Sequence, residues 1–187
     1  MDTFEQLDAV IPPLGDLVRG TRPDQMDNQT PCTDFTVRVL LGHFLGNLDS
    51  VADGLRGEPM PEALPPRPEM LGDDPAAVYD KVTSDLIAAA HEPGAMDRVL
   101  KVPFGEVPAP ALLQFIAFDL TMHSWDLATA TGQEYTPPDD LVAATDAFAR
   151  EAIAPEWRDG DTFAAEVEAP ASATPLERLV AFSGRRA

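Results

Sequence analysis

Three polar side chains lie on the apolar stripe of the most apolar helical pattern in the chain. In the segment 109–131, Asp119, His123 and Asp126 share a sector of about 120° with the large apolar residues when each residue is turned by about 100°. Carboxylates and imidazoles are costly in an apolar core unless they are paired or bind a ligand. The stripe therefore predicts a polar site that is buried in the core.

The spacing of Asp119 and His123 favours a shared metal ion. Side chains four residues apart on a helix face the same way, so a carboxylate and an imidazole can converge on one divalent cation. These ligand types are typical of Zn²⁺, with Ni²⁺ or Fe²⁺ as alternatives. His43, at the edge of the apolar stripe of the segment 35–55, is the candidate third ligand from a second helix.

Two further residues are placed to support these ligands. Asp126 follows His123 by three residues, and we expect it to orient the His123 ring or to accept a hydrogen bond from a loop N–H, rather than to ligate the metal itself. Asn47 follows His43 by one helical turn and is assigned the same supporting role.

Other interpretations of these residues need no metal. Asp119 and His123 could simply hydrogen-bond to each other or to a backbone carbonyl, and a single histidine such as His43 is usually an ordinary residue at the edge of a core. Cys32 precedes a helix, where its pKa could be lowered, but a lone cysteine there is more often a small packed residue. The sequence contains no Gly-x-Ser-x-Gly motif, no glycine-rich phosphate loop and no second acid–histidine pair for a two-metal site.

Composition narrows the range of partners. The chain has 187 residues, 13 Lys and Arg against 32 Asp and Glu, and a formal net charge of −19. Such a charge argues against nucleic acid and against anionic membranes, which attract basic proteins. The single cysteine excludes an internal disulfide, and no segment resembles a secretory signal or a membrane span. We expect a soluble cytoplasmic protein.

Proline clusters divide the chain into helical patterns that must position these residues. The apolar spacing predicts helices over about 2–19, 35–55, 75–91, 109–131 and 138–152, with a kink at Pro12-Pro13 and helix-capping residues at Thr33 and Asp34. A short extended piece or hairpin is expected over 98–105, a turn at 159–161, a short strand over 163–167 and a last helix over 175–182. The predicted fold is all-α, an up-down four-helix bundle in a single domain (1–187) with 153–187 as a C-terminal extension.

Three motifs of the chain resemble one known family. The segment 30–38 reads TPCTDFTVR and is followed by Leu41-Gly42-His43; the segment 123–132 reads HSWDLATATG; and the segment 175–185 reads PLERLVAFSGR. This order of motifs resembles the actinobacterial metal-binding family that is similar to the N-terminal domain of mycothiol-dependent maleylpyruvate isomerase, within the DinB-like superfamily. The resemblance spans nearly the whole chain.

The resemblance implies a DinB-like bundle that holds one divalent metal ion. Its ligands would be a histidine of the second helix and an acid-x-x-x-His pair of the fourth, which correspond to His43, Asp119 and His123 here. The acidic residue of the family is usually Glu, so Asp119 is a departure that shortens the ligand by one methylene group. A second departure is the small C-terminal extension, which does not match the larger second domain of the isomerase, so maleylpyruvate isomerisation is not carried over.

The leading functional hypothesis is a metal-dependent transferase that activates a low-molecular-weight thiol, with mycothiol as co-substrate, for attack on an electrophile. One alternative is a non-catalytic bundle that binds a metal or small ligand, or an interaction module. A second is a metal-dependent hydrolase, in which water takes the place of the thiol. The partners would be a small-molecule thiol and an electrophile, with a homodimer as the oligomeric state to test.

Overall fold

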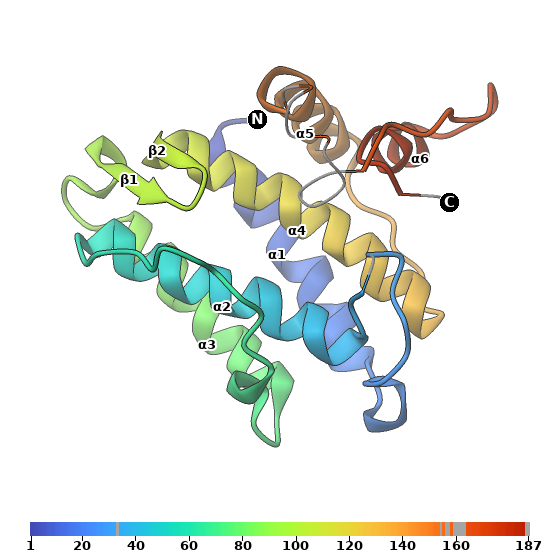
Figure 1. Cartoon of the computed structure of the whole chain (residues 1–187), viewed down its shortest axis with the longest axis horizontal. Coiled ribbons are helices and arrows are strands. Elements are labelled where there is room, and N and C mark those ends of the chain that lie inside the picture. The colour runs from blue at the N-terminus through green and yellow to red at the C-terminus, as the bar shows by residue number, and fades with distance from the viewer. Residues whose placement is uncertain (33, 154, 156–157, 159–163, 186–187) are drawn as a thin grey trace.

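The structure is a computed structural model that describes residues 1–187 except 33, 154, 156–157, 159–163 and 186–187. Its helices and strands are α1 (Thr3–Gly20), α2 (Val37–Arg56), α3 (Pro75–Ala90), β1 (Val99–Val102), β2 (Gly105–Pro108), α4 (Ala109–Thr131), α5 (Asp139–Ala152) and α6 (Pro175–Phe182). Short 3₁₀ turns, η1 (Pro23–Gln25), η2 (Pro68–Leu71) and η3 (Ala95–Asp97), lie in the connections. The predicted helices are therefore confirmed, with boundaries that differ by one or two residues (Figure 1).

The start of α2 differs from the prediction. Thr36, and not Asp34, caps the helix: its side chain accepts a hydrogen bond from the backbone N–H of Val39. Asp34 has φ 65° and belongs to the turn before the helix, which closes through the bond from Phe35 N–H to the Cys32 carbonyl. Thr33, the other expected cap, lies outside the described residues. The described loop residues 30–32 and 34–35 therefore precede the first turn of α2 as a hydrogen-bonded turn.

Pro12 and Pro13 do not end α1. The helix continues through both prolines from a capping box at its start, in which Asp2 and Glu5 each accept a hydrogen bond from the other's backbone N–H. The prolines remove two backbone donors, and packing holds the helix together instead. The side chain of Tyr79 on α3 donates a hydrogen bond to the carbonyl of Ile11 over 2.6 Å, which ties α3 to this part of α1.

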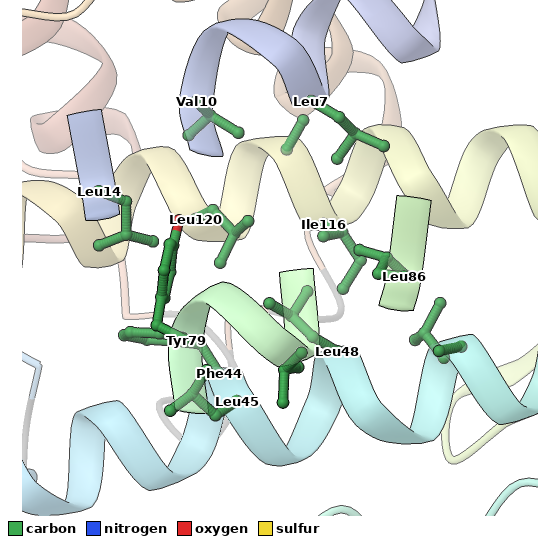
Figure 2. Packing of buried hydrophobic residues seen from close by; sticks show 14 of the residues in the cluster. Leu7, Val10, Leu14, Phe44, Leu45, Leu48, Tyr79, Leu86, Ile116 and Leu120 are labelled. Carbon is green, nitrogen blue, oxygen red and sulfur yellow. The ribbon is translucent and has the colours of Figure 1, made fainter. Parts of the chain in front are cut away.

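The main core lies among α1, α2, α3 and α4. Helix α1 packs on α3 and α4, and α2 packs on the same two helices from the other side. Leucine, valine and aromatic side chains fill the space between them, among them Leu7, Leu14, Phe44, Leu48, Leu86 and Leu120, all without exposed surface (Figure 2). This apolar filling holds α2 and α4 in a fixed relation, so a side chain on one is positioned against a side chain on the other.

Helix α4 is buried on all sides over most of its length. It packs against α1, α2 and α5, and not only the predicted stripe but also the opposite side is covered. Thr121 and Ser124, which fall outside the stripe, have no exposed surface, and their hydroxyl groups donate to backbone carbonyls one turn earlier. The helix that carries the polar site is thus the central helix of the fold.

Strands β1 and β2 form the expected hairpin between α3 and α4, with Val102 paired to Gly105 at its closed end. A predicted short strand over 163–167 is wrong for residues 164–167, which have no regular structure. Val167 instead donates one backbone hydrogen bond to Ala181 of α6, so this stretch is held by the helix and not by a partner strand. Phe163 and the turn predicted at 159–161 lie outside the described residues.

A second, smaller core joins α5 and α6 to α4. Phe118 and Met122 of α4 belong to one buried apolar cluster with Val142 and Ala149 of α5 and with the buried residues of α6. The guanidinium group of Arg150 lies 4.5 Å from the centre of the Phe182 ring, and that of Arg158 lies at the same distance. This packing brings the residues after α6 back to the middle of α4. Among the described residues, no helix is long and apolar enough to cross a membrane.

Candidate metal centre

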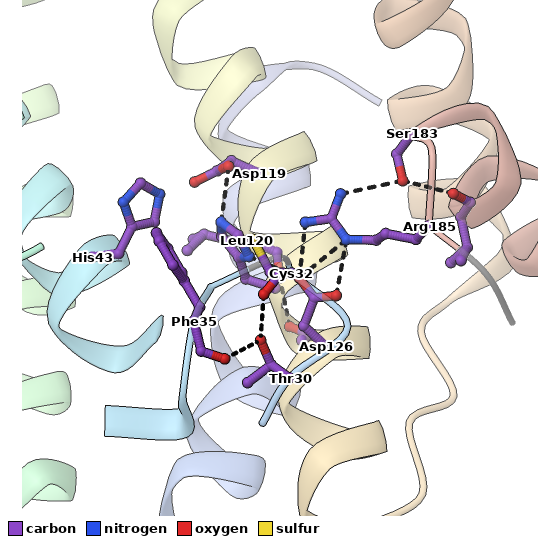
Figure 3. Close-up of polar contacts among 12 residues, drawn as sticks. Thr30, Cys32, Phe35, His43, Asp119, Leu120, Asp126, Ser183 and Arg185 are labelled. Atoms are coloured by element: carbon purple, nitrogen blue, oxygen red, sulfur yellow. Dashed lines mark hydrogen bonds and ion pairs between the residues drawn. The ribbon is translucent and has the colours of Figure 1, made fainter. Parts of the chain in front are cut away.

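His43, Asp119 and His123 come together at the interface of α2 and α4. The Oδ1 atom of Asp119 lies 3.2 Å from Nε2 of His123, and the centres of the His43 and His123 rings are 5.1 Å apart (Figure 3). One ligand atom from each of the three residues falls within 4.8 Å of the other two. Two imidazoles and one carboxylate at this separation fit the donor set of a transition-metal ion such as Zn²⁺.

The three side chains sit at the boundary of the core and shift one another's protonation. Burial and the neighbouring His123 lower the pKa of His43 to about 4, so His43 is neutral at neutral pH and one of its ring nitrogens carries no proton. Burial alone would raise the pKa of Asp119 and lower that of His123, but their mutual attraction reverses both shifts. Asp119 is therefore a carboxylate, as a metal ligand must be.

Asp126 contacts the other nitrogen of His123. Its Oδ2 atom lies 3.0 Å from Nδ1 of His123, and its side chain has no exposed surface. The contact that the sequence suggested between Asp126 and the His123 ring is therefore present. A carboxylate at Nδ1 keeps the proton on that nitrogen, which leaves Nε2 directed towards Asp119 and His43. The arrangement is the one that orients histidine ligands in many metal sites.

Asn47 is likewise next to the ligand that it was expected to support. Its Nδ2 atom lies 3.3 Å from Nε2 of His43, one turn earlier on α2. The ring of Phe35, from the loop before α2, packs edge-on against His43 with 5.2 Å between the ring centres. His43 is thus held by an amide on one side and by an aromatic ring on another.

Arg185 is a site residue that the sequence analysis did not single out. Its guanidinium group binds Asp126 with two nitrogen atoms, Nε to Oδ1 and Nη2 to Oδ2, each over 2.8 Å (Figure 3). The pairing follows α6 and joins residues that are 59 positions apart, so no periodicity connects them. One signal in the sequence could have indicated such a partner. A carboxylate on a buried stripe needs a cation, and the chain has only 13 Lys and Arg residues that could supply one.

Two other arginines and the third histidine of the chain lie in ordinary surroundings. Arg38 pairs with Asp27, and Arg98 donates to the carbonyl of Arg56 at the hairpin, so Arg185 is the arginine that the described structure brings to the cluster. His91 is exposed at the end of α3 and stacks on the ring of Phe4.

Cys32 lies beside the cluster without being activated by it. Its sulfur atom is within 4.8 Å of ligand atoms of His123 and Asp126, which makes a second group of possible donors. Burial raises the pKa of the Cys32 thiol to about 11, so the thiol keeps its proton at neutral pH. Asp126 is already bound by Arg185 and His123, and therefore the group of His43, Asp119 and His123 is the better candidate for a metal.

The chain also matches a known protein family. Residues 7–128 match the family described as the mycothiol maleylpyruvate isomerase N-terminal domain, over more than half of the chain. The chain belongs to this family. The matched residues include His43, Asp119, His123 and Asp126, whereas Arg185 lies beyond the end of the match.

Two full-length relatives come from Mycobacterium tuberculosis. They are the uncharacterized protein Rv0738 of strain H37Rv and the uncharacterized protein MT0763 of strain CDC 1551, and each is 34% identical over 174 residues, which are 90% of this chain and 90% of the relative. The similarity extends well past the family match, so these relatives share the C-terminal part of the chain as well as the helices of the family domain.

Solved structures confirm the fold. The crystal structures of a mycothiol-dependent maleylpyruvate isomerase and of a histidine-to-alanine mutant of that enzyme both superpose with a TM-score of 0.61 at 16% sequence identity. The superposition covers 79% of this chain and 68% of the enzyme. At this identity the likeness establishes a shared mostly helical fold.

Proposed function

We propose that the chain is a divalent-metal protein that uses a low-molecular-weight thiol, mycothiol or a close relative, as co-substrate in a transfer reaction. The observation that carries this proposal is the position of His123, whose two ring nitrogens face Asp119 and Asp126 while the His43 ring lies across from it. Membership of a family named for a mycothiol-dependent enzyme supports the choice of thiol.

His43, Asp119 and His123 are the residues that would hold the metal. His43 is neutral and Asp119 is ionised at neutral pH, so two of the three donors need no deprotonation before they bind a cation. A bound divalent cation would supply a Lewis acid that favours the thiolate form of a thiol at neutral pH. Asp126 holds the proton of His123 at Nδ1 and so keeps Nε2 available on the side of the other two donors.

The reacting thiol comes from outside the chain in this proposal. Cys32 is the only cysteine, and its raised pKa makes it a poor nucleophile at neutral pH. A small-molecule thiol that carries its own sulfur to the metal explains why the site contains no activated cysteine of its own. We further interpret α1–α4 as the up-down four-helix bundle of a single domain, with the metal between its second and fourth helices.

Elemental analysis of tag-free protein tests the metal directly. We expect close to one divalent ion per chain in the purified protein and its loss in His123→Ala. His91→Ala is the matched control, because His91 is an exposed histidine at the end of α3 that stacks on Phe4 and is not one of the proposed donors. Less than about 0.2 metal ions per chain in the wild type, unchanged by His123→Ala, would overturn the metal site.

Thiol consumption then tests the reaction. The metal-loaded protein is incubated with mycothiol and a panel of electrophiles, with and without a chelator. Chelator-sensitive consumption of the thiol supports the transferase. Metal binding without such turnover would favour a non-catalytic metal-binding module, and consumption of the electrophile without the thiol would favour a hydrolase.

A further inference from the structure

The C-terminal segment after α6 reaches the polar site through one side chain. Arg185 donates to both carboxylate oxygens of Asp126, and its third nitrogen, Nη1, donates to the hydroxyl of Ser183 over 3.2 Å. Its backbone N–H bonds to the carbonyl of Val180, which continues the last turn of α6. The guanidinium group is therefore fixed at both ends, by α6 on one side and by α4 on the other (Figure 3).

These contacts form a chain of three side chains that ends at a proposed ligand. Arg185 binds Asp126, and Asp126 binds Nδ1 of His123, while the opposite nitrogen of His123 faces Asp119. Asp126 has no exposed surface and the Arg185 side chain is 13% exposed, so water cannot replace either partner readily. A carboxylate with two planar N–H donors on it has one preferred orientation, and that orientation sets the angle of the imidazole.

We propose that Arg185 is a positioning residue, which holds Asp126 and, through Asp126, the His123 ring. The segment after α6 then contributes to the geometry of the metal centre. The consequence for the metal rests on the proposed function, whereas the orientation of His123 does not. With Arg185 included, the site extends past residue 128, where the family match ends.

The first experiment measures the affinity for Zn²⁺ alone by calorimetric titration of tag-free, metal-free protein. Loss of an outer partner of a histidine ligand typically weakens metal binding by about 10–100-fold, so we expect Arg185→Ala to fall at least at the lower end of this range. Arg185→Lys keeps the charge but not the paired donors, and we expect an intermediate affinity.

Two control variants separate this role from general damage. Arg178→Ala removes the same charge from an exposed position on α6. Arg150→Ala removes a guanidinium group that packs on Phe182 and thus loosens the contact of α5 with α6. Neither residue contacts Asp126 among the interactions described here, and both variants should bind Zn²⁺ as the wild type does. An equal loss in Arg150→Ala and Arg185→Ala would overturn the specific role of Arg185.

A double variant gives a readout that a merely structural role would not produce. If Arg185 acts through Asp126, then Arg185→Ala changes the Zn²⁺ affinity by less than about twofold once Asp126→Asn is present. A full, additive loss in that background overturns the proposal, as does an unchanged affinity in the single Arg185→Ala variant.

The second readout needs no metal and distinguishes failure of this inference from failure of the proposed function. In the metal-free wild type, the Nδ1 proton of His123 lies in a buried hydrogen bond and should give a slowly exchanging, low-field imidazole N–H signal in NMR spectra. We expect Arg185→Ala to shift or remove that signal and Arg178→Ala to leave it in place. If the wild type binds no Zn²⁺, the proposed function is wrong, and the NMR signal of His123 alone then tests the positioning role of Arg185.

Discussion

The carboxylate of Asp119 and the imidazole of His123 meet one helical turn apart on α4, with 3.2 Å between Oδ1 and Nε2. This separation is a hydrogen-bond distance, so in the metal-free chain the two groups form a charge-assisted pair at the edge of the core. A cation shared by both would replace the proton that now links them. The geometry of the pair is therefore compatible both with a structural contact and with two metal ligands, and only variants that affect these two roles differently can separate them.

Substitutions at Asp119 make that separation. Asp119→Asn keeps the size of the side chain and its ability to accept a hydrogen bond from His123, but it removes the anionic ligand. We expect Zn²⁺ affinity to fall by about 100-fold or more, beyond the effect of most outer partners. Asp119→Glu restores the residue usual in the family and should retain binding. Equal Zn²⁺ affinities of Asp119→Asn and the wild type in calorimetry would contradict ligation by this carboxylate.

Asn47 contacts the proposed metal ligand on the other helix. Because its amide contacts Nε2 of His43, Asn47→Ala should leave that ring freer to rotate and weaken Zn²⁺ binding by about tenfold. Asn28→Ala is a suitable comparison, since the Asn28 amide bonds to the carbonyl of Ala130 and not to a proposed ligand. Titration of both variants checks the prediction, which an equal effect on the two would refute.

Gly42, next to His43, allows another segment to cross α2 closely. A methyl group at this position would lie 2.5 Å from the backbone nitrogen of Pro68, and the Gly42 carbonyl accepts a hydrogen bond from Arg67 N–H. We expect Gly42→Ala to lower the free energy of unfolding by about 1–3 kcal/mol, as overpacking does. In Gly46→Ala the new methyl group meets only the Arg67 side chain, at 3.0 Å, which can move. Urea unfolding should therefore show a clearly smaller loss, and equal losses would disprove the steric argument.

The reactivity of Cys32 should follow its raised pKa. An ordinary cysteine has a pKa of about 8.5, so a pKa of about 11 leaves about 300-fold less thiolate at neutral pH. Because the thiolate is the reacting form, alkylation by iodoacetamide should be slow at pH 7 and accelerate as the pH rises towards 11. Denatured protein, in which the pKa returns to its usual value, supplies the reference rate. Rapid alkylation of the folded protein at pH 7 would restore Cys32 as a candidate nucleophile.

The helices could be predicted from the sequence because their apolar residues recur at the helical period. The start of α2 could not, because Thr30, Thr33, Asp34 and Thr36 are all good capping residues and propensity does not rank them. The hydrogen bond from Thr30 N–H to the Phe35 carbonyl closes a loop that moves the helix start to Val37. The backbone hydrogen bonds of this loop decide which residue caps the helix, and capping propensity alone does not contain that information.

The candidate site could likewise be predicted only in part from the sequence. Asp119, His123 and Asp126 share one helix, so helical geometry alone predicts that they lie together. His43 required the further assumption that α2 crosses α4 at the right level, and the described structure brings its ring to 5.1 Å from that of His123. Arg185 comes from a segment with no periodic relation to α4, and its contact depends on how α5 and α6 fold back.

The burial of α4 on all sides also limits how this protein can change its specificity. Substitutions on its central turns meet packed neighbours, so the helix tolerates little change and offers little surface for recognising different substrates. The described residues of the preceding loop, 30–32 and 34–35, which carry Phe35 against His43, are half-buried or exposed. Libraries aimed at new electrophiles should therefore vary this loop and leave α4 intact.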